Sequence, residues 1–493
     1  ADSSKKSLLA QIGVGTIDQA LLGVLLAKFQ SLRLFGLSNK VLVLDEIHAY
    51  DEYMNELICC LLTYLASSTT PVIMLSATIP AILRQRFLEA YNSGLPEPTA
   101  LNPESTEAPF PLVSCLSATG LIQSDFGEIK TRPSVRRTVE AHFVHSHNAV
   151  LSIIRDAIDS GRCCCWILNT VSDAITANDL LHSVPGIDRE KLHLFHARFA
   201  MGDRLRIESA VLDRFGKNST ARERSGRVLI ATQVVEQSLD LDFDVLITDL
   251  PPIDLLIQRA GRLMRHSRDA KGNPIPGSDE RGIARLYVHA PEFLTEPDAR
   301  WYKQKFRGGS LVYGNHSQLW NTQRVLREKQ SFVMPDDARQ LIESVYGRDT
   351  LIPEGLRENQ LSIERKQKKE ISEAANNRID LTAGYTWVND AQWDDLRAPT
   401  RLGLPTTRVL LLRFADERLH LWHRNEYAFA NSQLTLMEYV LAEELSGDDF
   451  AAWNAILPAL IKNLREQLPG KGDGLVLLPL EYQMQTLNWQ GYA

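Results

Sequence analysis

The chain has 493 residues, of which 44% are hydrophobic and 23% are charged, and its formal net charge is −7. This composition is ordinary for a globular protein, and no apolar run reaches the ~20 residues that cross a bilayer, which argues against a membrane protein and against a disordered one. At the usual ~150 residues per domain, the length suggests about three domains. The negative charge does not exclude nucleic acid, because a local basic track is enough to bind it.

The first residues and the cysteines indicate the compartment. Residues 1–9 include two lysines but are not followed by the long apolar region of a secretory signal. Cysteines 59–60 and 163–165 lie in apolar runs, where neighbours cannot easily bridge one another, and no zinc-binding spacing occurs. We therefore expect a cytoplasmic protein.

The first informative element is a strand-like run at residues 41–44, followed by Asp45 and Glu46. An apolar strand that ends in two carboxylates suits ATP hydrolysis at the carboxyl edge of a parallel sheet, where ligands bind. There Asp45 could hold Mg²⁺ through water, Glu46 could orient the attacking water, and His48 could link this site to the next loop. Taken alone, the pattern is as often an acidic surface loop, so its context decides.

A complete ATPase lobe would carry a phosphate loop ahead of this strand. The pattern G-x-x-x-x-G-K-[ST] occurs nowhere in the sequence, and the chain begins with Ala1 rather than Met. We therefore expect a fragment, or one of two polypeptides, with an incomplete first lobe. Because that loop supplies most contacts with the β and γ phosphates, the chain alone is expected to be inactive in ATP hydrolysis.

The next strand-like run, residues 71–75, leads into Ser76-Ala77-Thr78 and a helix ending near Tyr91. The hydroxyls of Ser76 and Thr78 could hydrogen-bond the preceding acidic motif and couple it to the state of the nucleotide. A tripeptide of this kind is more often only a helix N-cap, and the acidic motif before it makes the coupling role more specific. Residues 92–140 are rich in Pro, Ser and Thr and suit a linker.

From residue 141 to 295 the sequence alternates between strand and helix patterns, which predicts a doubly wound lobe. We expect strands at 163–168, 192–195, 228–231, 245–248 and 283–289, and helices at 149–160, 171–183 and 203–214. Later, residues 364–370 form a charged, solvated stretch, and residues 409–412 and 448–467 resemble a strand and a helix.

Within this lobe, the strand at 228–231 leads into Thr232 and on to Asp240. Backbone amides and the Thr232 hydroxyl at this strand end could hold nucleic-acid phosphates. Asp240 could meet either a nucleotide ribose or the arginines that follow. A capped helix without a ligand is the alternative interpretation, and in isolation it would be favoured.

The segment Q-R-A-G-R-L-M-R at 258–265 places arginines 259, 262 and 265 at intervals of three, which predicts one helical strip. A guanidinium suits a γ-phosphate approached across a cleft, where such an arginine is worth roughly 10³ to 10⁵ in rate. A basic surface helix that pairs with acids is the alternative.

In order and spacing these elements resemble a superfamily 2 helicase, and more specifically the CRISPR-associated helicase–nuclease of type I systems, helicase portion only. The resemblance lies in V-L-V-L-D-E-I-H-A-Y-D at 41–51, L-F-H-A-R-F at 194–199, A-T-Q-V-V-E-Q-S-L-D at 231–240 and the segment 258–266, with a weaker match at 15–19. It implies an α/β fold of two RecA-like lobes with parallel sheets, the first incomplete, plus a small mixed α/β C-terminal domain.

The expected division follows from these motifs. It assigns residues 1–110 to the C-terminal part of the first lobe, 111–140 to the inter-lobe linker, 141–295 to the second lobe, 296–400 to a helical linker region and 401–493 to a C-terminal accessory domain.

The resemblance also implies roles for individual residues. ATP and Mg²⁺ would be bound at Asp45 and Glu46, with Asp240, Gln258, Arg259 and Arg262 contacting the nucleotide, and His48, Arg259 and Arg262 taking part in catalysis. Ser76 and Thr78 would couple the sites. Single-stranded DNA would run along Thr16, Thr78, Asn169, Thr170, His196, Arg198, Thr232 and Gln233.

The implied function is an ATP-dependent single-stranded-DNA translocase or helicase of CRISPR type I interference. Its expected partners are a Cascade-type surveillance complex and an N-terminal half carrying the phosphate loop and nuclease. No His-Asp dipeptide occurs among the 12 histidines, so the family's nuclease activity is not expected here. The alternatives are a non-catalytic fragment that binds DNA or Cascade, and another superfamily 2 repair or RNA helicase.

Overall fold

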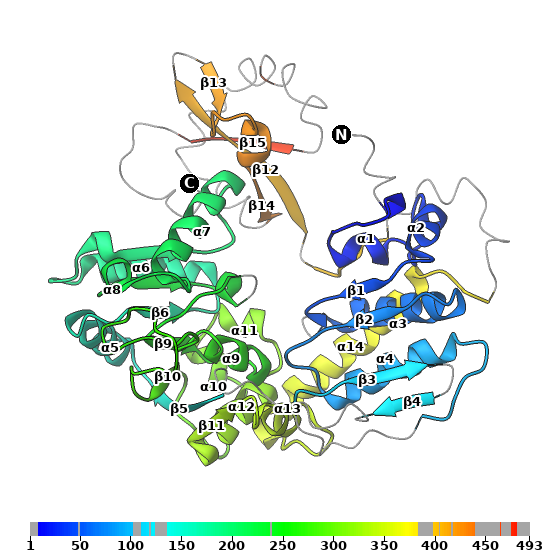
Figure 1. The fold of residues 1–493 in the computed structure, drawn as a ribbon, viewed down its shortest axis with the longest axis horizontal. Coiled ribbons are helices and arrows are strands. Elements are labelled where there is room, and N and C mark those ends of the chain that lie inside the picture. Colours follow the sequence, from blue (N-terminus) through cyan, green and yellow to red (C-terminus); the bar gives the residue numbers. More distant parts are fainter. Residues whose placement is uncertain are drawn as a thin grey trace.

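The computed structural model describes the greater part of the chain, and everything below concerns those residues. They are 8–47, 50–101, 110–117, 120–123, 136–236, 239–382, 398–403, 405–415, 418–438, 464 and 475–480. Two α/β lobes lie side by side, and a smaller unit built on a sheet lies above the space between them (Figure 1). The predicted α/β fold class is therefore confirmed.

The first lobe contains a short parallel sheet of two strands, β1 (Leu42–Leu44) and β2 (Val72–Met74), in which Leu42 pairs with Val72. Around it lie α1 (Ile17–Leu21), α2 (Gln30–Leu37), α3 (Glu52–Ser67) and α4 (Ala81–Ser93), with the hairpin β3 (Ser114–Ser117) and β4 (Gly120–Gln123) alongside. The side chain of Asp51 caps α3 by accepting from the Met54 amide at 2.8 Å. Apolar side chains of α3 then form the centre of this lobe's core.

The second lobe is built on a seven-stranded sheet in the order β11-β5-β10-β9-β6-β8-β7. Its strands are β5 (Arg137–Val144), β6 (Cys164–Ile167), β7 (Leu192–Phe195), β8 (Val228–Ala231), β9 (Val245–Asp249), β10 (Ala284–His289) and β11 (Ser331–Met334). All are parallel to their neighbours except β11. The five predicted strands are confirmed. The strands β6, β8 and β9 are buried throughout, as their largely apolar runs predict, whereas β7 and β10 are partly buried.

Two strands of this sheet were not predicted. The polar residues of β5 alternate with apolar ones, so this strand lacks the apolar run of central strands such as β6 and β8. The strand β11 lies within the range expected to be a helical linker and pairs antiparallel with β5. The sheet therefore extends on both sides beyond the expected limits of residues 141–295.

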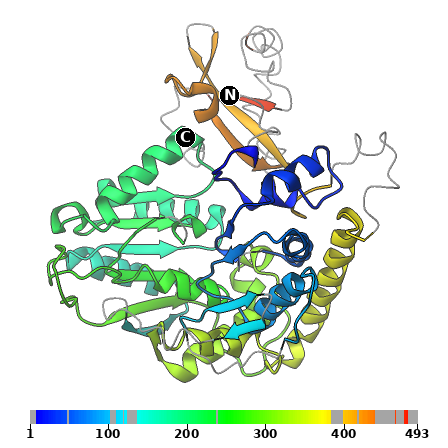
Figure 2. The ribbon, with the colours of Figure 1, turned by 45° about the vertical axis from the view of Figure 1, so that its right-hand side comes forward.

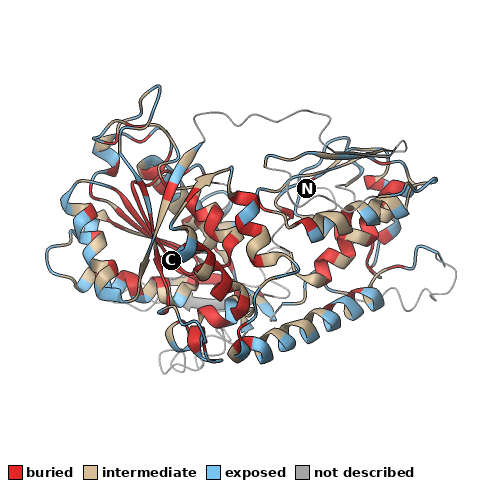
Figure 3. Cartoon of the chain, turned by 90° about the horizontal axis from the view of Figure 1, so that it is seen from below, coloured by how far each residue is buried: buried red, intermediate tan, exposed pale blue. Residues whose placement is uncertain are grey.

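Helices cover both faces of this sheet. They are α5 (His147–Asp159), α6 (Val171–Ser183), α7 (Met201–Phe215), α8 (Ala221–Arg224) and α9 (Ile253–Ala260), followed by α10 (Trp301–Lys305), α11 (Gly309–Val312), α12 (His316–Lys329) and α13 (Ala338–Tyr346). Short 3₁₀ turns occur at Arg189–Lys191, Gln233–Val235 and Glu354–Leu356. Buried residues concentrate in this sheet and in the helices packed on it (Figure 3).

One long helix, α14 (Arg357–Asn377), connects the two lobes (Figure 2). It follows the second lobe and packs against α3, and the residues at its C-terminal end pair with the first lobe. There the Leu26 amide donates to the Asn377 carbonyl at 2.8 Å, and the Ile379 amide donates to the Val24 carbonyl at 2.8 Å. No helix in the described ranges is both long enough and apolar enough to span a membrane.

The smaller unit is centred on β12 (Thr406–Ala415), which pairs with β13 (Arg418–Leu421), β14 (Gln433–Met437) and β15 (Leu475–Leu480). The predicted strand at 409–412 is confirmed and is buried. The helix expected at 448–467 lies outside the described residues except for position 464. The unit contacts the start of α7, where Trp422 Nε1 donates to Asp203 Oδ2 at 2.8 Å.

Candidate nucleotide and nucleic-acid site

The acidic motif and the coupling motif lie at the same edge of the first lobe. Asp45 and Glu46 follow β1, and Ser76 and Thr78 follow β2, so the parallel pairing of the strands brings the two segments together. Glu46 has a φ of 55°, which turns the chain sharply after the strand. The Thr78 amide donates to Ser76 Oγ at 3.3 Å. His48 lies outside the described residues.

Residues of the second lobe face this edge across a cleft of about 1300 Å³ between the lobes. Its lining includes Glu46 and Ser76 on one side and Gln258, Arg262 and Arg265 on the other. Gln258 Nε2 lies 3.5 Å from Thr78 Oγ1, so the two walls also meet directly. Of the groups predicted to converge on a nucleotide, the Glu46 carboxylate and the Arg262 guanidinium therefore line one cleft, whereas Asp45 and Arg259 are not part of its lining.

Arg262 is held on its wall by backbone carbonyls. Its Nε donates to the Val235 carbonyl at 3.1 Å and its Nη2 donates to the Glu236 carbonyl at 2.6 Å. Burial, reinforced by the charge of Arg265, lowers the pKa of Arg262 to about 10, while carboxylates including Glu46 act in the opposite direction. Arg262 therefore stays charged at neutral pH and interacts electrostatically with the opposite wall.

Arg259 lies in a different environment and is fully buried in the second lobe. Its Nε donates to Glu236 Oε1 at 2.7 Å, and its Nη1 donates to Thr248 Oγ1 at 2.6 Å and to Asn169 Oδ1 at 3.1 Å. Its Nη2 donates to Tyr313 Oη at 3.1 Å. In this conformation Arg259 holds together several strand ends and does not reach the cleft, so its predicted contact with a phosphate stays a prediction.

The expectation of one helical arginine strip is wrong. The helix α9 ends at Ala260, Gly261 is its C-cap, and Met264 has a φ of 46°. Arg262 and Arg265 therefore lie beyond the helix, on a loop that turns them toward the cleft, while Arg259 remains on the helix and points into the core. A glycine just after the last helical residue is the sequence signal that marks this end.

Arg265 is a cleft residue for which the sequence predicts no individual role. Its Nε forms an ion pair with Asp240 Oδ1 at 2.7 Å, and His266 Nε2 lies 2.8 Å from the same oxygen. Partial burial favours the neutral acid, but the His266 hydrogen bond and the Arg265 charge outweigh it and lower the pKa of Asp240. Of the two partners predicted for Asp240, the structure supplies the arginine.

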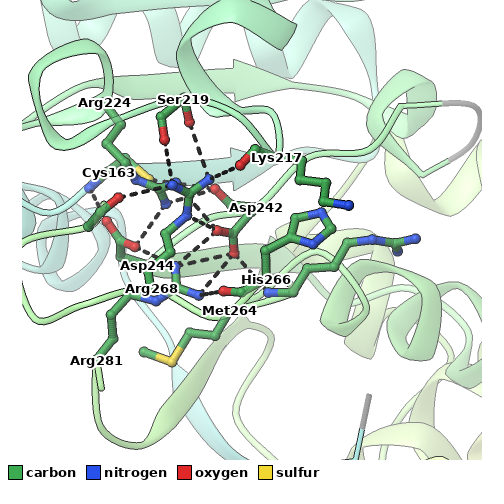
Figure 4. Close-up of polar contacts among 12 residues, drawn as sticks. Cys163, Lys217, Ser219, Arg224, Asp242, Asp244, Met264, His266, Arg268 and Arg281 are labelled. Atoms are coloured by element: carbon green, nitrogen blue, oxygen red, sulfur yellow. Dashed lines mark hydrogen bonds and ion pairs between the residues drawn. The ribbon is translucent and has the colours of Figure 1, made fainter. Parts of the chain in front are cut away.

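A buried ion network supports the loop that carries Arg265 (Figure 4). Asp242 Oδ1 accepts from the Arg265 amide at 2.8 Å, and its carboxylate also pairs with Arg224, Arg268 and Arg281. Asp244 adds ion pairs with Arg224 and Arg281, and Asp279 adds one with Arg281. Three guanidinium groups thus face three carboxylates, so the charges balance inside the lobe. No local sequence pattern marks this network, because its members are separated by up to 57 positions (281 − 224).

The predicted DNA-contacting residues of the second lobe gather at one sheet edge. Asn169 and Thr170 follow β6, His196 and Arg198 follow β7, and Thr232 and Gln233 follow β8. These strands are parallel, so their carboxyl ends lie at the same edge. Thr16 and Thr78 belong instead to the first lobe.

Burial divides these residues into two groups. The side chains of Asn169, His196 and Thr232 are buried, and the amide group of Asn169 is occupied by the Leu250 carbonyl, Tyr302 and Arg259. Thr78 is also buried. Thr16 is exposed, and Thr170, Arg198 and Gln233 are partly exposed. Thr170 Oγ1 accepts from the Asp173 amide at 3.0 Å, and Gln233 Nε2 donates to the Asn169 carbonyl at 2.9 Å.

Known proteins are similar to this chain in sequence and in fold. Residues 160–268 match the family model described as CRISPR-associated nuclease/helicase Cas3, C-terminal. The CRISPR-associated endonuclease/helicase Cas3 of Escherichia coli is 35% identical over 353 residues, which cover 70% of this chain and 37% of that protein. The chain is a Cas3-like helicase portion. The Cas3 protein of Thermus thermophilus is 33% identical over 85% of this chain and 48% of its own length.

Solved Cas3 structures extend the likeness to the whole described fold. The crystal structure of T. fusca Cas3-AMPPNP has a TM-score of 0.78 and 28% identity, covering 97% of this chain and 55% of that one. A chain of a CRISPR RNA-guided surveillance complex, pre-nicking, has a TM-score of 0.73 and 28% identity, covering 98% and 59%. This chain thus spans about half the length of the solved Cas3 chains and 37% to 48% of these two curated relatives.

His196 gives this Cas3-like portion a predicted sensitivity to acid. Its ring is fully buried, stacks on Phe199 with 4.3 Å between ring centroids, and accepts from the Arg198 amide at 3.2 Å through Nδ1. Burial, helped by the Arg198 charge, lowers the pKa of His196 to about 3. The histidine of the unfolded chain takes up its proton near pH 6.5. The neutral His196 therefore contributes its full stability above that pH, and this contribution is lost as the pH is lowered toward 3.

Because of His196, we expect the free energy of unfolding to fall by about 2 kcal/mol when the pH is lowered from 7 to 5, since each pKa unit is worth about 1.4 kcal/mol. His196→Asn places an amide oxygen near the position of Nδ1 but cannot titrate, so this part of the pH dependence should disappear. Urea titrations of both proteins at pH 7 and pH 5 measure it. Equal pH dependence in the two proteins would contradict the assignment.

Proposed function

We propose that this chain is the motor part of an ATP-dependent translocase or helicase acting on single-stranded DNA in type I CRISPR interference. The observation that carries the proposal is the position of Glu46 and Arg262 on opposing walls of one cleft. Solved Cas3 structures with AMPPNP, ADP and ATP support a nucleotide in these relatives, and the surveillance complex supports a Cascade-type partner. A cytoplasmic location is part of the same proposal.

In the proposed reaction the first lobe supplies the carboxylates. Asp45 is exposed at the strand end, where its oxygens suit Mg²⁺, a cation that prefers oxygen ligands and keeps several waters. The bound ion would neutralise charge on the phosphates. Glu46, which lines the cleft, would orient the water that attacks the γ-phosphate.

The second lobe would supply the positive charge. Arg262 would stabilise the γ-phosphate, and Arg265, paired with Asp240, would lie next to it on the same wall. Arg259 would act as a positioning residue that joins the sheet edge to the loop carrying Arg262 and Arg265, here called the arginine loop. The contact between Gln258 and Thr78 would form when the lobes close and would thereby link closure to the Ser76–Thr78 segment.

The open sheet of the first lobe supports a partner that completes it. Among the described strands, β1 and β2 pair only with each other, although parallel sheets are normally covered on both faces. Val43, Ile73 and Leu75 are each 47% to 53% exposed. We propose that further strands carrying a phosphate loop join this sheet, on the same polypeptide or on another.

The carboxyl edge of the second lobe would hold the DNA. Thr170, Arg198 and Gln233 offer partly exposed polar side chains there, and Thr16 offers one on the first lobe. Asn169, His196 and Thr232 would contribute backbone groups and keep the edge rigid, because their side chains are buried.

The test combines this chain with a polypeptide containing the phosphate-loop half of a curated relative, and it measures ATP hydrolysis with and without single-stranded DNA. We expect background hydrolysis from each part alone and DNA-stimulated hydrolysis from the combination. A stable combination that binds DNA tightly without hydrolysing ATP would favour the non-catalytic alternative. Stimulation by RNA rather than by DNA would favour an RNA helicase.

A further inference from the structure

The helix that follows the coupling motif begins with a contact from the other lobe. The helix α4 starts at Ala81, and its N-cap residue Pro80 has no side-chain hydrogen bond to offer. The Ala81 amide instead donates to Glu343 Oε1 at 2.8 Å. Glu343 lies on α13, so a carboxylate of the second lobe caps a helix of the first. This contact lies three positions beyond Thr78 in the sequence.

The helix α13 is fixed firmly to the second lobe. Leu341, Ile342 and Val345 are buried in that lobe's core. Tyr346 Oη donates to Asp254 Oδ1 at 2.6 Å, and Asp254 lies in the first turn of α9. One helix thus contacts the start of α4 on one side and the start of α9 on the other, at the junction of the lobes (Figure 1).

Electrostatics favour the same arrangement. The amino end of a helix carries a partial positive charge, which stabilises a nearby carboxylate. Arg339 lies one turn before Glu343, with its Nε 3.9 Å from Glu343 Oε1, so a cation also lies close to the capping carboxylate. The Glu343 side chain is only 19% exposed, so water screens these interactions weakly.

The position of this cap matters because of the residues on either side of it. Thr78 meets Gln258 of α9 across the cleft, and Arg262 follows α9 on the same wall. Movement of α4 relative to α13 would therefore change the distance between the coupling motif and the arginine loop. Conversely, an α4 that is fixed to α13 keeps this distance constant.

We propose that Glu343 is a positioning residue, which caps α4 from the opposite lobe and thereby fixes the Ser76–Thr78 segment against Gln258 and Arg262. Its consequence for catalysis depends on the proposed function, but the contact itself does not. Glu343 touches no reacting group and acts through the helix that it caps.

Hydrogen exchange of individual backbone amides tests the proposal on this chain. In Glu343→Ala we expect about fivefold faster exchange at Ala81, the effect of losing one helix cap. The Thr78 amide, which donates to Ser76 Oγ, should also exchange faster. Glu343→Gln keeps an acceptor oxygen and should restore most of the protection at both amides. Glu328→Ala is the control, because Glu328 forms an exposed ion pair with Arg324 within α12.

The outcomes are distinct. Unchanged exchange at Ala81 in Glu343→Ala would overturn the inter-lobe cap. Faster exchange at Ala81 with unchanged exchange at Thr78 would show a local cap only and would overturn the positioning role. In the combination with a phosphate-loop partner, Glu343→Ala should lower kcat for ATP with little change in KM. Absence of hydrolysis in the unsubstituted combination would instead refute the proposed function and leave the exchange result standing.

Discussion

Replacing Asp242 with asparagine is expected to lower the free energy of unfolding of the second lobe by about 3–5 kcal/mol, the cost of breaking a buried ion pair from one side. Asp242 is completely buried and pairs with Arg224, Arg268 and Arg281. The asparagine has nearly the same shape but no charge, so three guanidinium groups would be left facing two carboxylates. Urea titration followed by intrinsic fluorescence measures the loss.

The matched control for this experiment is Asp298→Asn. Asp298 pairs with Arg300 at 3.5 Å, but both side chains are more than half exposed, so we expect a change of at most about 1 kcal/mol. A similar small loss in Asp242→Asn would mean that the network is not needed for stability. Because the Asp242 charge anchors the loop that carries Arg265 to three buried guanidinium groups, ATP hydrolysis by the combined protein should fall in this variant as well.

Replacing Arg262 with alanine is expected to reduce kcat for ATP hydrolysis by roughly 10³- to 10⁵-fold in the combination with a phosphate-loop partner. The reason is that Arg262 is charged and lines the cleft opposite Glu46. DNA binding should change little, since Arg262 does not lie at the sheet edge that we propose to hold DNA. Steady-state kinetics and a DNA titration on the same preparation measure both quantities.

Two further variants make this result specific. Arg262→Lys keeps the charge but loses the planar fork, so we expect only a small part of the activity to return. Arg259→Ala should lose activity together with stability, because it leaves Glu236 buried and unpaired, whereas Arg262→Ala should lose activity alone. Full hydrolysis by Arg262→Ala would contradict a role for the guanidinium at the γ-phosphate.

Local patterns were sufficient to predict much of this fold. Runs such as Val228 to Ala231 are apolar throughout because both faces of a central strand are covered, so the sequence carries the signal directly. The same reasoning failed for β5, whose alternating residues leave part of the strand exposed. It also failed for β11, where residues 331–334 join the sheet only through pairing with β5.

The site was predictable where it depends on parallel strands. Asp45, Glu46, Ser76 and Thr78 follow two strands, and the carboxyl ends of parallel strands necessarily share an edge. Their partners were harder to predict. The spacing of Arg259 and Arg262 would place both side chains on one face of a continuous helix. Because α9 ends at Ala260, Arg259 is buried and Arg262 lines the cleft.

The sequence by itself determined the α/β class, the central strands and the motifs at their ends, because each depends on neighbouring residues. Only the tertiary structure decided which arginine faces the cleft, which carboxylates neutralise Arg224, Arg268 and Arg281, and that Glu343 caps a helix 262 positions away. These contacts join residues that are distant along the chain. Their geometry depends on how whole elements pack, and a local pattern carries no information about that packing.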